Sequence, residues 1–199
     1  MTNNHPQEYS QDLTDKRLNI LCDHILDTIH DSIIDTSGKD DTAWTKGCLL
    51  YGRMQGLLRR LVTKKTYSWL SLANNTMDFT AKIGSAHIQF VIDDPYNPKK
   101  VHRLHTNSVE NMQFNMALEE QEDIQVVAWR LFITIDKNNR EAEPTATLMG
   151  FDLNQNELSR WEYIDTANVP MESPLTVTAE IEEPELQLKK QIDKANNEE

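Results

Sequence analysis

The stretch Asp123–Asp136, DIQVVAWRLFITID, is the longest apolar run of the chain and the richest in β-branched and aromatic residues. As a strand it would carry apolar side chains on both faces, which indicates a strand that other parts of the fold cover on both sides. Arg130 interrupts the pattern, because a guanidinium in the middle of such a strand needs a carboxylate or another anion beside it. The sequence thus predicts a buried central strand with one charged side chain.

Upstream of this strand, the clearest local pattern predicts a β-hairpin. Apolar residues alternate along Met77–Ile83 and along Ala86–Ile92, and the dipeptide Gly84-Ser85 between them suits a two-residue type II′ turn. Turn chemistry and alternation therefore specify the same register. The expected pairs are Ile83 with Ala86, Ala81 with Ile88, Phe79 with Phe90 and Met77 with Ile92.

Two helices are expected before the hairpin, at Asp12–Thr36 and Thr42–Lys64, because apolar residues recur at helical spacing in both stretches. The short segment between them contains Gly38, a helix-terminating residue, and folds the helices into a helical hairpin. The wide apolar face of the second helix includes Trp44 and Cys48. Three glycines lie within this face, and each weakens a helix by roughly 1 kcal/mol relative to alanine, so close contact with a neighbouring element is expected to compensate. They are Gly47, Gly52 and Gly56.

The two cysteines lie on the predicted helices, Cys22 on the first and Cys48 on the second. At roughly 1.5 Å per residue they would lie about 10 Å out of level across the helical hairpin. A disulfide needs Cα atoms within about 7 Å, so both residues are predicted to be buried, free thiols. Together with an N-terminus that lacks an apolar signal core, they favour a cytoplasmic location.

Further strands are expected on either side of the central one. The segment 111–119 could be a helix opened by Ser108, but its strict alternation from Met112 to Leu118 favours a strand. Another hairpin is expected across the turn 154–157. The remaining expected strands are 99–106, 145–153, 158–164 and 175–181.

These elements define an α+β fold in which the N-terminal helical hairpin packs on a largely antiparallel, meander-type sheet. Short loops between strands permit only antiparallel neighbours. The sheet either bends around the helices or curls into a barrel. The expected organisation is a disordered lead at 1–10, a single domain at 11–183 and an acidic tail at 184–199 that is partly helical or disordered. Within the domain, the helical hairpin occupies 12–65 and the sheet 77–181.

Charge is unevenly distributed along the chain. The net charge of −12 argues against nucleic acid as a partner. Residues 42–109 nevertheless hold 10 basic and 3 acidic residues, a net charge of +7, between two acidic ends. Either these parts neutralise one another within the fold, which is the preferred interpretation, or the basic part binds an anionic partner. No segment approaches the roughly 20 apolar residues of a transmembrane helix, so no membrane association is expected.

Two groups of residues are candidates for binding. Arg130, with its neighbours Trp129 and Phe132, could hold an anionic ligand if its face lines a cavity. The preferred alternative is an ion pair, with Glu162 or Asp152 as partner. The second group is the basic end of the second helix, which either compensates the helix dipole or binds an acidic partner. It consists of Arg59, Arg60, Lys64 and Lys65.

No motif typical of an enzyme is present, and no cofactor is expected. His87, His102 and His105 are weak candidates for metal ligands, because a site would need three such groups on one face of the sheet. The sequence favours a non-enzymatic cytoplasmic accessory or adaptor protein that binds another protein. A small-ligand carrier with a cavity in the sheet is the alternative, and a metal-dependent hydrolase is the third. The oligomeric state is left open.

Overall fold

The computed structural model describes residues 4–36, 38–74, 76, 79–96, 106–120, 127–136, 139 and 142–164. All of them belong to the first of two compact units, Met1–Ile164 and Asp165–Glu199. The predicted strand 175–181 and the tail 184–199 lie outside the described residues, as does the predicted strand 99–106 apart from Thr106. Among the described residues, no helix combines the length and the apolar character needed to cross a bilayer.

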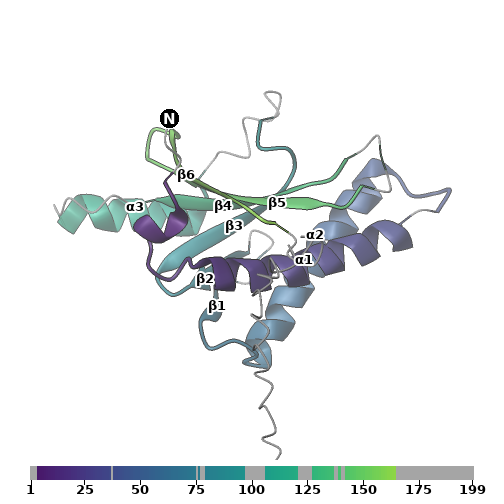
Figure 1. Ribbon diagram of the computed structural model, residues 1–199, viewed down its shortest axis with the longest axis horizontal. Coiled ribbons are helices and arrows are strands. Elements are labelled where there is room, and N and C mark those ends of the chain that lie inside the picture. The colour runs from purple at the N-terminus through teal and green to yellow at the C-terminus, as the bar shows by residue number, and fades with distance from the viewer. Residues whose placement is uncertain are drawn as a thin grey trace, which may run out of the picture. The chain divides into compact units, whose positions relative to one another are not determined.

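The predicted α+β class is confirmed: two N-terminal helices pack on a six-stranded mixed sheet (Figure 1). Helix α1 spans Asp15–Asp35 and helix α2 spans Ala43–Thr63, each within three residues of the predicted bounds. Both start at a threonine N-cap, where the hydroxyl of Thr14 accepts from the amide of Arg17 and that of Thr42 from the amide of Thr45. Such caps satisfy free amides of the first turn, which explains why both starts can be read locally.

In the described part of the chain, the sheet contains six strands, which lie in the order in which they occur along the chain. Neighbouring strands are antiparallel except β3 and β4, which are parallel. The expectation of purely antiparallel neighbours is therefore wrong at one place. Because β1 and β6 form opposite edges, the sheet is open, and the predicted alternative of a barrel is also wrong. The strands are β1 (Leu70–Asn74), β2 (Thr80–Ile83), β3 (Ala86–Ile92), β4 (Ala128–Thr134), β5 (Thr145–Phe151) and β6 (Glu157–Glu162).

The parallel pair is explained by a second correction. The segment predicted as a strand at 111–119 belongs to helix α3, Ser108–Glu120, which lies between β3 and β4 in the chain and supplies the long crossover that parallel strands need. A reciprocal cap starts this helix: Asn107 Oδ1 accepts from the amide of Glu110 at 2.9 Å, and Glu110 Oε2 accepts from the amide of Asn107 at 3.0 Å. Met112, counted in the apolar alternation, is 65% exposed.

The β2–β3 hairpin is confirmed in its described part. Ile83 pairs with Ala86 and Ala81 with Ile88, as predicted. Gly84 has φ +58°, in the left-handed region, as the first central residue of a type II′ turn requires. The second predicted hairpin is also present, as β5 and β6 joined by a turn in which the Asp152 carboxylate accepts from the amides of Asn154 and Asn156.

The two faces of the sheet have different surroundings. Trp129, Leu131 and Ile133 of β4 belong to the main core, which also contains the buried faces of α1 and α2. Phe132 lies on the opposite face of β4 in a smaller cluster with Met149 and Phe151. The central strand is therefore covered on both sides, as its sequence predicts.

The segment expected to be a disordered lead is ordered from Asn4 onward. It contains a short 3-10 helix, η1 (Pro6–Glu8), and Asn4 forms a bridge to Ser159 of β6. The ring of Tyr9 packs edge-on against Trp129, with centroids 6.3 Å apart. These contacts join the start of the chain to the far edge of the sheet.

Both cysteines are free thiols, as expected, but they differ in burial. Cys22 lies in the main core, and burial raises the pKa of its thiol. Cys48 is exposed, which corrects the prediction of two buried thiols. The difference arises because Cys48 lies on the solvent side of α2.

Candidate protein-interaction surface

Arg130 is a buried residue that forms an ion pair within the chain. Its side chain is 1% exposed, and its Nη2 lies 3.0 Å from Oε2 of Glu110, which is 2% exposed. Burial lowers the pKa of the Arg130 guanidinium, and the Glu110 carboxylate acts in the opposite direction. The ion pair predicted for Arg130 therefore exists, but its partner comes from α3 and is neither Glu162 nor Asp152.

The residues expected to line a cavity with Arg130 do not lie together. Trp129 is in the main core on the other face of β4, because successive residues of a strand point to opposite sides. Phe132 shares the face of Arg130 but is fully buried in its own cluster. The guanidinium of Arg130 instead lies over the ring of Phe151, 5.4 Å from its centroid.

The histidine candidates receive no support as a metal site. His87 on β3 is half-buried, and its Nδ1 is 2.6 Å from Nε2 of Gln113 on α3. His102 and His105 lie outside the described residues. Within the described part of the chain, no group of three His, Cys, Asp or Glu residues could hold a metal ion.

The basic end of α2 is exposed, as a partner-binding surface would have to be. Its members are Arg59 and Arg60 in the last turns of the helix, and Lys64 and Lys65 directly after it. In the part of the chain that the structure describes, none of the four has an ion-pair partner. These cations are therefore available to an acidic partner and also lie at the negative end of the helix dipole.

The solvent side of α2 corrects the prediction made for its glycines. A Cβ atom built on Gly47, Gly52 or Gly56 would meet no atom within 4 Å, so these glycines do not mediate close contacts within the chain. Trp44, expected on the buried face, is 78% exposed. We call five exposed residues with a spacing of four the outer row. They are Trp44, Cys48, Gly52, Gly56 and Arg60.

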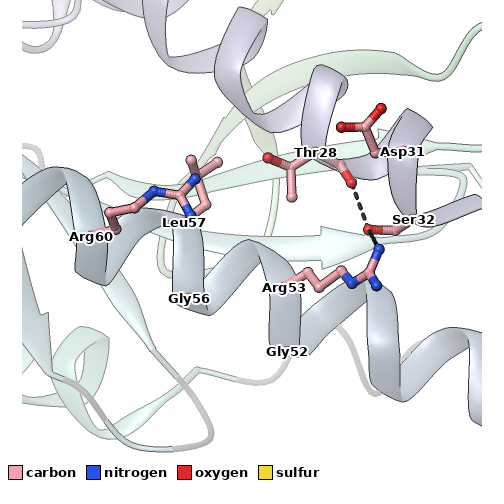
Figure 2. Close-up of a pocket in the computed structure, with 8 residues that line it drawn as sticks. All are labelled: Thr28, Asp31, Ser32, Gly52, Arg53, Gly56, Leu57 and Arg60. Carbon is pink, nitrogen blue, oxygen red and sulfur yellow. Dashed lines mark hydrogen bonds between the residues drawn. The ribbon is translucent and has the colours of Figure 1, made fainter. Parts of the chain in front are cut away.

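A recess of about 540 Å³ lies beside the outer row, between α1 and α2 (Figure 2). From α1 it is lined by Thr28, Asp31 and Ser32, and from α2 by Gly52, Gly56 and Arg60, among others. The surface is hollow here because the two glycines have no side chains to fill it.

The walls of the recess are held by polar contacts between the helices. Nη1 of Arg53 lies 2.6 Å from Oδ2 of Asp35 and donates to Oγ of Ser32 at 3.4 Å. Oγ of Ser32 in turn donates to the carbonyl of Thr28 at 2.6 Å (Figure 2). Arg53 thus contacts residues of α1. Arg60, which also lines the recess, belongs to the basic end and is exposed to solvent.

Sequence reasoning identified the basic end but missed the recess and the outer row. The only signal in the sequence was the set of three glycines in a helix. The glycines were predicted to contact a neighbouring element of the same chain, because the apolar face of α2 is too wide to show which side of the helix is buried. No protein-family model matches the chain, and the comparisons with curated proteins and with solved structures gave no match either. The surface itself must therefore carry the functional argument.

Proposed function

We propose that this is a non-enzymatic cytoplasmic accessory or adaptor protein that binds another protein through the solvent side of α2. The observation that carries the proposal is the glycines of this helix, which have open space where their side chains would be. Each exposed glycine lowers helix stability by roughly 1 kcal/mol relative to alanine. No contact of the described residues offsets this loss, whereas a partner that approaches the backbone closely would.

The residues around these glycines suit protein binding. Trp44 is largely exposed, and Arg59 and Arg60 are accessible on the same helix. Tryptophan and arginine are the residue types most enriched among the energetically dominant positions of protein interfaces. The basic end has no ion-pair partner among the described residues and favours a partner segment with negative charge, which would be guided to α2 by long-range attraction.

The recess makes this surface concave, so that side chains of a partner can be inserted into it. At about 540 Å³ it can accept one or more side chains of a partner. Its position beside Gly52 and Gly56 places it where a partner helix could come nearest to α2. We therefore expect the partner to present a helix with an acidic portion, packed along the outer row.

Site-specific photo-cross-linking in cells that express the protein tests this proposal. A photoreactive amino acid at the exposed Thr45, next to Trp44, should yield a protein adduct, and the same group at the exposed Gln11 should not. The substitution Arg59→Glu should reduce the Thr45 adduct at least about 10-fold, because it reverses a charge of the basic end. Reversal of the exposed Lys16 on α1 is the matched control and should leave the adduct unchanged. Absence of any Thr45 adduct, or equal loss with both reversals, would contradict the proposal.

A further inference from the structure

We infer that the first residues of this chain close an edge of the sheet at which β6 would otherwise pair with β6 of a second copy. Residues 4–10 form this closing segment, which we call the N-terminal strap. The inference concerns β6 and not α2, so it stands or falls independently of the proposed function. It is carried by the contacts of the strap with β6 and by the order of side chains along β6.

The outer side of β6 presents backbone groups for pairing. In the described part of the chain, β6 is the last strand of the sheet, and β5 is its neighbour on one side only. Directly after β6, the amide of Tyr163 donates to the carbonyl of Ala146 on β5 at 2.9 Å. Because alternate residues of an antiparallel strand bond to the same neighbour, the amides and carbonyls of Arg160 and Glu162 point away from β5. An edge of this kind can add a strand from another chain.

The N-terminal strap lies on this outer side of β6 (Figure 1). Asn4 forms a parallel bridge with Ser159, whose Oγ donates to the carbonyl of Asn4 at 2.7 Å. The hydroxyl of Tyr9 donates to the carbonyl of Leu158 at 3.3 Å, and its ring packs against Trp129. While the strap is in place, it therefore keeps another strand away from this part of β6.

Without the strap, β6 is complementary to itself in an antiparallel pair with its two-fold axis at Trp161. Counting outward from this residue, Arg160 faces Glu162 of the other copy, and Leu158 faces Ile164. Each match occurs twice, once on either side of the axis. The first joins opposite charges, and the second joins apolar side chains, of which Ile164 is 66% exposed in the single chain. Directly opposed pairs of both kinds stabilise antiparallel strands.

The neighbouring register that pairs the same backbone groups is less favourable. A two-fold axis at Arg160 would place its two copies directly opposite each other, and like charges in such positions destabilise a sheet. Within one chain, Arg160 lies 3.0 Å from Glu157 and 3.7 Å from Glu162. These contacts hold the guanidinium on the face of the sheet where the carboxylate of the second copy would arrive.

Loss of the strap also removes neighbours from two aromatic rings. Trp129, against which Tyr9 packs, is 3% exposed. Trp161 is 8% exposed, and its Nε1 shares Oδ1 of Asp15 with His5. In the proposed pair the two Trp161 side chains lie at the axis and cover each other, so burial of apolar surface favours association. The contact uses the same patch on both copies, as most homodimers do.

Release of the strap in the full chain tests the inference. The variant His5→Ala/Tyr9→Ala lacks two side chains that hold the strap, and its mass is followed by sedimentation between about 1 and about 200 µM. The unchanged protein should remain at 23.0 kDa over this range. The release variant should reach twice that mass, with an affinity for itself at least about 10-fold higher than that of the unchanged protein. Alanine at the exposed Gln7 of the strap is the matched control and should leave the protein monomeric.

The register is tested by charge reversal in the release variant. Arg160→Glu brings two carboxylates together on either side of the axis and should weaken the dimer at least about 10-fold. Adding Glu162→Arg restores opposite charges at the same positions and should recover the dimer. Lys39→Glu, in the exposed loop between α1 and α2, is the control and should leave the dimer unchanged.

A release variant that keeps its fold and stays monomeric to about 200 µM would overturn the inference, as would an unchanged protein that dimerises equally tightly. A dimer that Arg160→Glu does not weaken, or that Glu162→Arg does not recover, would also overturn it, because the contact would then lie elsewhere. Circular dichroism verifies the fold of every variant. If the double variant unfolds, Tyr9→Ala alone provides the same comparison. None of these substitutions lies on α2, so the Thr45 adduct tests the proposed function separately.

Discussion

Gly84 is the residue whose backbone conformation leaves least choice of side chain. Its φ of +58° favours glycine, and a Cβ atom there would also overlap with the carboxylate of Asp12, which precedes α1. The turn between β2 and β3 is therefore in close contact with the start of the helical hairpin.

We expect Gly84→Val to lower the free energy of unfolding by at least about 2 kcal/mol, because a β-branched residue resists positive φ and Asp12 would have to move. Urea denaturation measures this loss. Gly47→Ala is the control, since its surroundings are open and alanine favours the helix, so it should leave stability unchanged or raise it by up to about 1 kcal/mol. An unchanged urea midpoint for Gly84→Val would show that the turn conformation is wrong.

The buried ion pair between Arg130 and Glu110 allows a second prediction about single substitutions. Arg130→Met should lower the free energy of unfolding by about 3–5 kcal/mol, because it leaves the Glu110 carboxylate buried without its cation. Adding Glu110→Gln should recover a substantial part, because the charge that lost its partner is removed. Arg160→Met breaks a more exposed pair with Glu157 and should cost less than about 1 kcal/mol. Equal losses for both arginines in urea denaturation would contradict this assignment.

At the scale of elements, helix α3 is joined to the sheet by polar contacts at a spacing of three. Nδ2 of Asn107 donates to Oγ1 of Thr80 at 3.0 Å, Glu110 pairs with Arg130, and Gln113 contacts His87. Residues three apart lie on one side of a helix, so the described side chains that join α3 and its N-terminal cap to the sheet are polar. Such an interface depends on the charge state of its members.

His87 makes the α3 contact sensitive to pH. Burial, followed by the nearby Lys82, lowers the pKa of His87 below its ordinary value of 6.5. The unfolded chain therefore binds a proton at this residue more readily, so the contribution of neutral His87 to stability is lost as pH falls below 6.5. We expect the melting temperature to fall more between about pH 7.5 and about pH 5.5 in the unchanged protein than in His87→Gln. Identical falls in the two proteins would exclude His87 as a source of the pH dependence.

At the scale of the whole molecule, the N-terminal segment links the start of α1 to strand β6. His5 Nε2 lies 2.9 Å from Oδ1 of Asp15 at the start of α1, and Nε1 of Trp161 on β6 donates to the same oxygen at 2.8 Å. Both hydrogen bonds lower the pKa of the Asp15 carboxyl below its ordinary value of 3.8, and the one with His5 has the larger effect. The carboxylate thus links the N-terminal segment, α1 and β6, and this contribution to stability is lost only as pH falls below 3.8.

Removal of residues 2–10 should lower the free energy of unfolding by roughly 2–4 kcal/mol, because it uncovers Trp129 and removes the hydrogen bonds of Asn4 and His5. Thermal unfolding of the truncated chain measures this. Tyr9→Ala should reproduce part of the loss, and alanine at the exposed Gln7 should have little effect. A truncated chain that melts at the same temperature as the full chain would show that the segment contributes nothing to stability.

The hydrophobic pattern predicted most elements but failed at α3. Met112 and the apolar residues that alternate after it suggested a strand, whereas the described contacts of α3 and its cap with the sheet are polar. Apolar spacing could not have indicated these polar contacts. The cap formed by Asn107 and Glu110 was a usable local signal, because the two residues are spaced as a capping box requires.

The sequence by itself determined the two helices, the Gly84 hairpin and the buried character of the central strand. These features depend on neighbours within a few residues: a threonine cap, a glycine with positive φ, and apolar side chains at a fixed period. Only the tertiary structure decided that Arg130 pairs with Glu110, that β3 and β4 are parallel, and that the glycines of α2 face solvent. Each of these depends on which distant segments meet, and several pairings satisfy the same local pattern because burial is not directional.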